Sequence, residues 1–129
     1  MIAHVYGRLK MYAYMRREFA AYVELEQGSW PFARTIADFY TAYYESDGQT
    51  CSRLLPELEA YFGKEMGPSA FEVAVACFSA GENDKGFEWL ERSYSMGEGY
   101  LPYIRFYLQL DGIRTDPRYL DLLKRLGLD

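Results

Sequence analysis

His4 is the sole histidine of the chain, and it decides which nucleophilic chemistry the sequence can support. A Ser-His or Cys-His catalytic pair needs a histidine as its base, so such a pair would have to use this residue. We expect His4 to be an ordinary histidine on a helix surface. Cys51 and Cys77 stand in apolar or helical context without CxxC spacing, which predicts two reduced thiols and neither a disulfide nor a zinc site.

Paired carboxylates are the other route to acid and base chemistry. Asp38 and Glu45 are seven residues apart, so they fall on one face of an expected helix. A solvated or partner-facing surface explains this pair better, which leaves a small enzyme with acidic groove residues as the remote alternative.

The glycine-rich stretches predict turns and no ligand site. Residues 97–99, Gly-Glu-Gly, have no strand before them, as a phosphate-binding loop requires. Residues 81–86 lack the alternating ligands and the closing glutamate of a calcium loop. We therefore expect no cofactor, no metal and no catalysis.

Composition narrows the class of protein further. The 129 residues suit one domain, and 50% hydrophobic residues are enough to bury a core. The net charge is −5 and no run of Lys or Arg is long enough to follow a phosphate backbone, which disfavours nucleic-acid binding. The apolar runs are shorter than the ~20 residues of a membrane span, and the first residues lack a secretory apolar region. We expect a cytoplasmic protein that does not bind membranes.

Residues 71–94 predict two short amphipathic helices joined by a tight turn at Gly81. Apolar residues recur at three- and four-residue steps on both sides of this glycine, so each helix has one apolar face. Ser69 and Glu72 have the spacing of a capping box at the start of the first helix. Trp89 should be among the largest buried side chains of the hairpin.

Earlier in the chain, residues 1–27 carry an apolar stripe at helical spacing, which fits either one long helix or a hairpin broken near residues 15–17. Residues 32–45 and 50–63 predict a second hairpin. Pro56 lies within or just beyond the first turn of its second helix if that helix begins at about residue 52.

The last part of the chain predicts a closing pair of helices. Residues 101–110 should form a helix that covers the preceding hairpin, and a further helix should begin at Pro117 with Asp116 as its N-cap. Arg114 should fix the loop between them by binding backbone carbonyls or Asp111.

An internal repeat connects these hairpins. Gly48 and Gly81 are 33 residues apart, and at this offset the helical segments around them pair apolar with apolar positions. Extended backwards, the same offset puts Met15 at a turn, which favours a hairpin in residues 1–27. The offset is close to the ~34-residue period of helix-turn-helix repeats, whose units must stack to bury their apolar faces.

With this repeat, the chain resembles the tetratricopeptide repeat proteins. Two segments carry the resemblance, which covers about residues 37–128: GENDKGFEWLERSY at 81–94, and DGIRTDPRYLDLLKRLGL at 111–128. The second is similar to the tail "LRsDPRFqdLLrrlgL" that follows the last repeat in many bacterial tetratricopeptide proteins. The chain departs from the pattern where the consensus alanine of the second helix is Gly86 in one unit and Arg53 in another.

The resemblance implies an all-α fold, a right-handed α-solenoid of about three antiparallel helix hairpins with a C-terminal capping helix pair. It would form a single domain over residues 1–129. Its parts would be three repeats at 1–30, 31–66 and 67–98, the first of them degenerate, and a cap at 99–129.

The resemblance also implies a protein-protein interaction module or scaffold that binds a peptide or partner protein on the concave face lined by the first helices. By position, that face comprises Val5, Leu9, Tyr12, Asp38, Ala42, Glu45, Phe71, Val75, Phe78, Arg105 and Gln109. An apolar patch rimmed by acid suits a partner segment with basic and apolar residues. The alternative for Phe71, Val75 and Phe78 is ordinary core between helices.

Self-assembly is the alternative function. A stack of about three units would leave its N-terminal edge uncapped. Ile2, Tyr6, Met11 or Tyr14 could then pair with a second copy and form a homo-oligomer.

Overall fold

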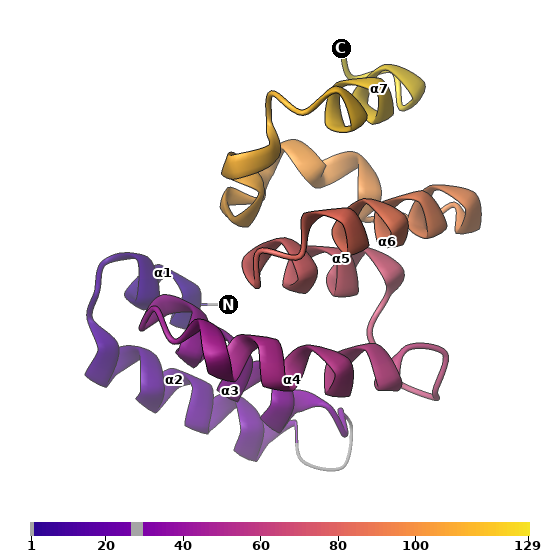
Figure 1. Cartoon of the computed structure of the whole chain (residues 1–129). Helices are drawn as coiled ribbons and strands as arrows, with labels where there is room; N and C mark the ends of the chain where they lie inside the picture. Colours follow the sequence, from indigo (N-terminus) through magenta and orange to yellow (C-terminus); the bar gives the residue numbers. More distant parts are fainter. Residues whose placement is uncertain (1, 27–29) are drawn as a thin grey trace. The chain divides into compact units, whose positions relative to one another are not determined.

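The computed structural model describes residues 2–26 and 30–129, and all regular structure in this part of the chain is helical (Figure 1). Neighbouring helices pack in pairs, α1 with α2, α3 with α4 and α5 with α6. The predicted all-α fold of paired helices is thereby confirmed. The elements in order are α1 (Ile2–Arg8), α2 (Tyr12–Leu25), α3 (Ala33–Tyr44), α4 (Gly48–Tyr61), α5 (Ala70–Ser79), α6 (Asn83–Met96), the 3₁₀ helices η1 (Leu101–Phe106) and η2 (Leu108–Ile113), and α7 (Pro117–Arg125).

The chain divides into two compact units, Met1–Pro68 and Ser69–Asp129, each with its own helix pairs. In the first unit, the hairpin expected in residues 1–27 is confirmed over the described residues, but its turn lies at Lys10 and not near Met15. Lys10 has a φ of 58°, and Met11 N donates to Tyr6 O at 2.9 Å. Met15 is instead fully buried in α2. The sequence pattern did not predict the position of this turn, because the residue in the left-handed conformation is a lysine and not a glycine.

The second hairpin of this unit consists of α3 and α4, as predicted, and α4 starts earlier than expected. Asp47 caps it by accepting hydrogen bonds from the backbone N of Thr50 at 3.1 Å and from its hydroxyl at 2.6 Å. Helix α4 therefore begins at Gly48, which places Pro56 in the helix interior and corrects the expected place near the first turn. Pro56 is exposed and has no N–H to donate to the carbonyl of Ser52.

In the second unit, the hairpin of α5 and α6 confirms the predicted helix-turn-helix. The capping box is present, with Glu72 N donating to the Ser69 hydroxyl at 3.1 Å and Ser69 N donating to the Glu72 carboxylate at 2.8 Å. Trp89 is only half-buried, which corrects the expectation of a largely buried side chain. Its ring packs against the core from outside, and the Arg92 guanidinium lies 4.4 Å from the ring centroid.

Residues 101–110 form 3₁₀ helices and not the expected α-helix. Because a 3₁₀ helix has three residues per turn, side chains three apart share one row. Leu101 and Ile104 make the buried row of η1, whereas Tyr103 is 58% exposed in the outer row. The core of this unit comprises Phe71, Ala74, Val75, Phe78, Phe87, Leu90, Leu101, Ile104, Leu110, Ile113, Tyr119 and Leu122.

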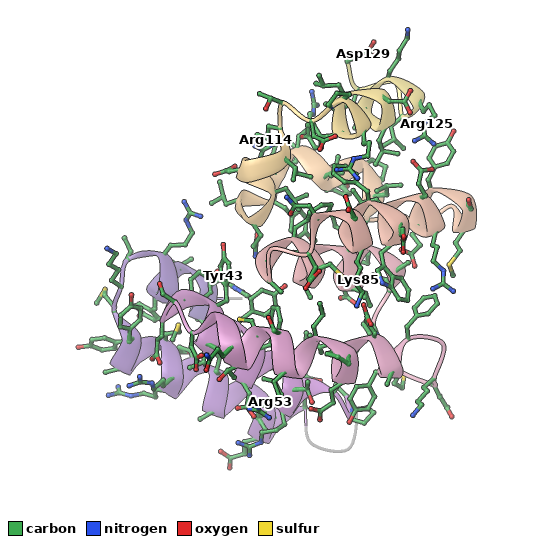
Figure 2. The ribbon with its side chains drawn as sticks, viewed as in Figure 1. Tyr43, Arg53, Lys85, Arg114, Arg125 and Asp129 are labelled. Atoms are coloured by element: carbon green, nitrogen blue, oxygen red, sulfur yellow. The ribbon has the colours of Figure 1, made fainter. Side chains whose placement is uncertain are left out.

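Helix α7 begins as predicted, with Asp116 accepting a hydrogen bond from Arg118 N at 2.9 Å and Pro117 at the first position. Arg114 fixes the preceding loop as expected (Figure 2). It donates to Asp111 at 2.9 Å, to the hydroxyl of Tyr119 at 3.0 Å and to the carbonyl of Tyr107 at 3.1 Å. One guanidinium thereby joins η2, α7 and the end of η1.

Candidate interaction surfaces

Three of the predicted surface residues are well exposed on the first helices of the two hairpins in the first unit. Val5 in α1 is 54% exposed, Leu9 just after α1 is 62% exposed, and Asp38 is exposed on α3. Helices α1 and α3 contact each other directly. The chain thus presents two aliphatic side chains and one carboxylate from neighbouring helices of one unit.

The other predicted residues of this unit are partly or wholly withdrawn from solvent. Ala42 is buried and Tyr12 is half-buried. The Glu45 carboxylate forms an ion pair with Arg16 of α2, so it ties α3 to α2. A Glu45 engaged in this way is a poor partner for Asp38 in acid and base chemistry.

Phe71, Val75 and Phe78, predicted as concave-face residues with core packing as the alternative, are buried at 1%, 4% and 7% exposure. All three belong to the core of the second unit. The ring of Phe71 packs edge-on against Tyr107 with centroids 4.9 Å apart, and Phe78 packs edge-on against Phe87 at 5.0 Å. Their side chains hold α5 to the elements that follow.

The two residues predicted from the cap differ in exposure. Arg105 is exposed and donates to the carbonyl of Leu128 at 3.3 Å, while Gln109 is half-buried. Beside Arg105, three aromatic side chains that were not predicted from the sequence are exposed, two of them in η1 and one just before it. They are Tyr100, Tyr103 and Phe106, at 63%, 58% and 71% exposure.

His4 lies in an aromatic cluster of the first unit, which corrects its expected place on a helix surface. Its Nδ1 shares a hydrogen bond of 2.9 Å with the hydroxyl of Tyr44. The rings of Phe19, Tyr40 and Tyr44 meet the imidazole edge-on at centroid distances of 5.6, 4.9 and 5.7 Å. A Cβ added to Gly7 would come within 2.5 Å of the Tyr44 ring, so the backbone of α1 lies directly on this tyrosine.

Burial sets the protonation of this cluster. It lowers the pKa of His4 to about 4 and raises the pKa of Tyr44 to about 12. At neutral pH the imidazole is uncharged and the phenol keeps its proton, so the pair holds α1 to α3 by a neutral hydrogen bond. The sequence around His4 does not predict this hydrogen bond, because its partner Tyr44 is forty residues away in the chain.

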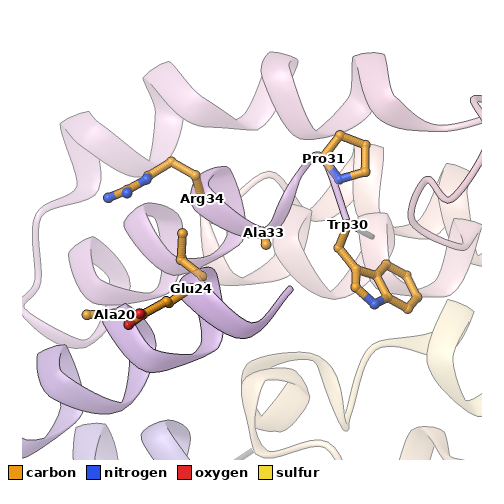
Figure 3. Close-up of a pocket in the computed structure, with 7 residues that line it drawn as sticks. Ala20, Glu24, Trp30, Pro31, Ala33 and Arg34 are labelled. Atoms are coloured by element: carbon orange, nitrogen blue, oxygen red, sulfur yellow. The ribbon is translucent and has the colours of Figure 1, made fainter. Parts of the chain in front are cut away.

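A surface pocket of about 500 Å³ lies between the end of α2 and the start of α3 (Figure 3). It offers a carboxylate from Glu24 and a guanidinium from Arg34, both on exposed residues. This pocket was not among the sites predicted from the sequence. The lining residues are Ala20, Val23, Glu24, Trp30, Pro31, Ala33 and Arg34.

Both cysteines are free thiols, as predicted, and both are buried. The thiol of Cys51 donates to the carbonyl of Phe39 at 3.6 Å, and burial raises its pKa, which keeps it protonated and unreactive. Within residues 2–26 and 30–129, no cluster of His, Cys, Asp and Glu side chains could hold a metal ion. No helix in the same ranges is long and apolar enough to cross a membrane.

Comparisons with protein-family models, with curated proteins and with solved structures gave no match.

Proposed function

We propose that this chain is a helical-repeat protein of tetratricopeptide type, a right-handed solenoid that binds a peptide or partner protein on its first helices and performs no catalysis. The observation that carries this proposal is the register between α6 and α7. Asp84 and Glu91 of α6 bind Arg118 and Arg125 of α7, and each pair is separated by 34 residues. This spacing equals the period of tetratricopeptide repeats.

The register also gives the direction of the two helices. Asp84 pairs with Arg118, and seven residues further on in both helices Glu91 pairs with Arg125. Because the second ion pair lies seven residues after the first in both helices, α6 and α7 run parallel at this face. Parallel second helices, one repeat apart, are what stacking of helical hairpins produces.

The first unit supports the same arrangement through its first helices. His4 of α1 contacts both Tyr40 and Tyr44 of α3, and Gly7 lies against Tyr44, so the two first helices of this unit pack directly on each other. These are the helices that expose Val5 and Asp38. A surface of first helices with exposed aliphatic and acidic side chains supports a binding role better than a catalytic one.

Affinity capture from cells of the source organism, followed by binding measurements with the purified partner, tests this proposal. The bait variants are Asp38→Lys on the proposed face and Arg53→Glu as a matched control, since Arg53 is exposed on the second helix α4 (Figure 2). Calorimetry should show binding by wild type and by Arg53→Glu and a loss of about tenfold or more in Asp38→Lys. A partner that binds all three proteins equally would place the binding surface elsewhere and contradict the proposal.

Self-assembly remains the second candidate, because apolar side chains are exposed at the start of the chain. Ile2 is 54% exposed, Met11 39% and Tyr14 47%. Sedimentation equilibrium over a hundredfold range of concentration decides this candidate. A mass that rises with concentration in wild type and stays at 15.0 kDa in Ile2→Ser would support it, and a constant wild-type mass of 15.0 kDa would exclude it.

A further inference from the structure

The first hairpin has a charge that differs from the rest of the chain. Residues 2–17, the N-terminal edge, contain four of the 14 basic residues and none of the 19 acidic ones. The whole chain has a net charge of −5, so this edge is a basic surface on an acidic protein. Such an asymmetry attracts partners of opposite charge to one place.

The same edge exposes an apolar stripe. Ile2 and Val5 of α1 and Leu9 just after it follow one another at three- and four-residue steps. Leu9 N donates to Val5 O at 3.1 Å, so the three side chains continue one helical face. They are exposed at 54%, 54% and 62%. Beside them the ring of Tyr6 stacks on Tyr14 of α2, with centroids 5.4 Å apart and an angle of 29° between the rings.

The opposite face of α1 already holds this helix in place. Ala3 and Gly7 are buried there, and His4 is hydrogen-bonded to Tyr44. The outer stripe therefore contributes little to packing within the unit. An apolar helix face that is held in position but uncovered is typical of a binding surface.

Basic side chains border this stripe. Arg8 and Lys10 are exposed, and neither forms an ion pair with any residue that the structure describes. The Arg17 guanidinium lies 5.4 Å from the centroid of the Tyr14 ring. Arg16 is already paired with Glu45, so Arg8, Lys10 and Arg17 are the cations that a ligand would meet.

We propose that the N-terminal edge binds an acidic amphipathic helix of a partner protein. The apolar side of that helix covers Ile2, Val5 and Leu9, and its carboxylates pair with Arg8 and Lys10. This inference goes beyond the proposed function: the acidic helix is a second ligand, bound at the edge of α1, and is distinct from the partner that Asp38 of α3 contacts. It also differs from the basic segment expected from the sequence. Two copies joined edge to edge would bring basic residues together, so charge complementarity favours an acidic partner over a second copy.

Fluorescence anisotropy with two designed peptides tests the proposal. One is a helical peptide with a leucine stripe flanked by glutamates, and the other has lysine in place of every glutamate. The full chain should bind the acidic peptide at least about tenfold more tightly than the basic one, and added salt should weaken this binding.

Matched variants locate the site. Arg8→Glu with Lys10→Asp should lose about tenfold or more in affinity for the acidic peptide. The control, Arg53→Glu with Lys64→Glu, makes the same change in net charge at exposed positions of the same unit and should stay within about twofold. Circular dichroism should show the same helix content in all three proteins.

Three outcomes would overturn the inference: equal binding of both peptides, binding of neither, or an equal loss in both double variants. Vesicles of phosphatidylserine and phosphatidylcholine provide a further arm. Binding to these vesicles without binding to the acidic peptide would reassign the edge to an anionic membrane surface. If the peptide arm fails while Asp38→Lys still loses a captured partner, the proposed function stands and only this partner class is wrong.

Discussion

Arg125 in α7 and Glu91 in α6 are 34 residues apart in the chain, and the guanidinium of the first donates to both carboxylate oxygens of the second. Arg125 also donates to Asp121 at 2.9 Å and lies 4.8 Å from the centroid of the Tyr94 ring (Figure 2). Seven residues earlier, Arg118 repeats the arrangement with Asp84 and the ring of Phe87. Helix α7 is therefore fixed to α6 by two equivalent contacts, each an arginine between a carboxylate and an aromatic ring.

Replacing Arg125 by Lys should destabilise the protein by about 0.5 to 1 kcal/mol, because a lysine cannot reproduce the forked hydrogen bonds or the stacking on Tyr94. Urea unfolding measures the difference, which should shrink in high salt. Lys124→Ala, at an exposed neighbouring position, is the control and should be close to neutral. Equal stabilities of Arg125→Lys and wild type at low salt would show that this contact does not hold α7.

Acid should weaken the first unit through His4. The pKa of His4 is about 4 in the folded chain against an ordinary 6.5, so the unfolded chain binds this proton more readily. The resulting stability is complete above pH 6.5 and is lost as the pH falls towards 4, by an amount on the order of 2 to 3 kcal/mol.

Urea unfolding at several pH values between 7 and 4, compared with His4→Gln, measures this loss. A glutamine stays neutral and can still share a hydrogen bond with Tyr44, so the variant should be less pH-dependent in this range. Carboxylates titrate equally in both proteins, which makes the difference between them specific to His4. Parallel pH profiles would mean that His4 is not buried in its neutral form.

Gly86→Ala should destabilise the second unit by about 1 to 2 kcal/mol, although alanine is the better helix former. The added Cβ would lie 2.6 Å from two carbons of the Phe78 ring, which is itself in the core. Gly48→Ala at the start of α4 meets no atom within 4 Å and should be neutral or stabilising. Thermal unfolding in which both variants gained stability would disprove the close contact of α6 with Phe78.

Glu98→Ala should cost about 1 to 2 kcal/mol, because its carboxylate satisfies two amide groups at the start of another helix. The backbone N atoms of Ala70 and Phe71 in α5 each donate to Glu98 at 2.9 Å. Glu82→Ala, which removes an exposed glutamate at the turn before α6, is the matched control. Chemical denaturation should separate the two variants, and equal midpoints would contradict the capping role.

The sequence predicted what is encoded locally. The capping box of Ser69 and Glu72, the N-cap Asp116 and the role of Arg114 all depend on residues a few positions apart, and the structure confirms them. The turn at Lys10 was misplaced because a non-glycine residue adopts positive φ there. No local sequence pattern predicts that a lysine adopts this conformation, because the position of the turn depends on how α1 and α2 pack.

The surfaces were harder to predict than the helices. Helical spacing predicts that Phe71, Val75 and Phe78 lie on α5, but their burial depends on α6, η1, η2 and α7, which contribute to the same core. The cluster around His4 likewise joins residues of α1, α2 and α3. Contacts between elements distant in sequence decide which apolar residues stay exposed, and a single sequence carries little record of them.

Photo-crosslinking tests the central claim, that the first helices form the binding surface, most directly. A benzophenone amino acid placed at Asp38 on α3, and in a second protein at Arg53 on α4, would be activated in cells of the source organism. We expect a discrete crosslinked partner from position 38 and none from position 53. Crosslinks from position 53 alone, or the same products from both positions, would contradict it.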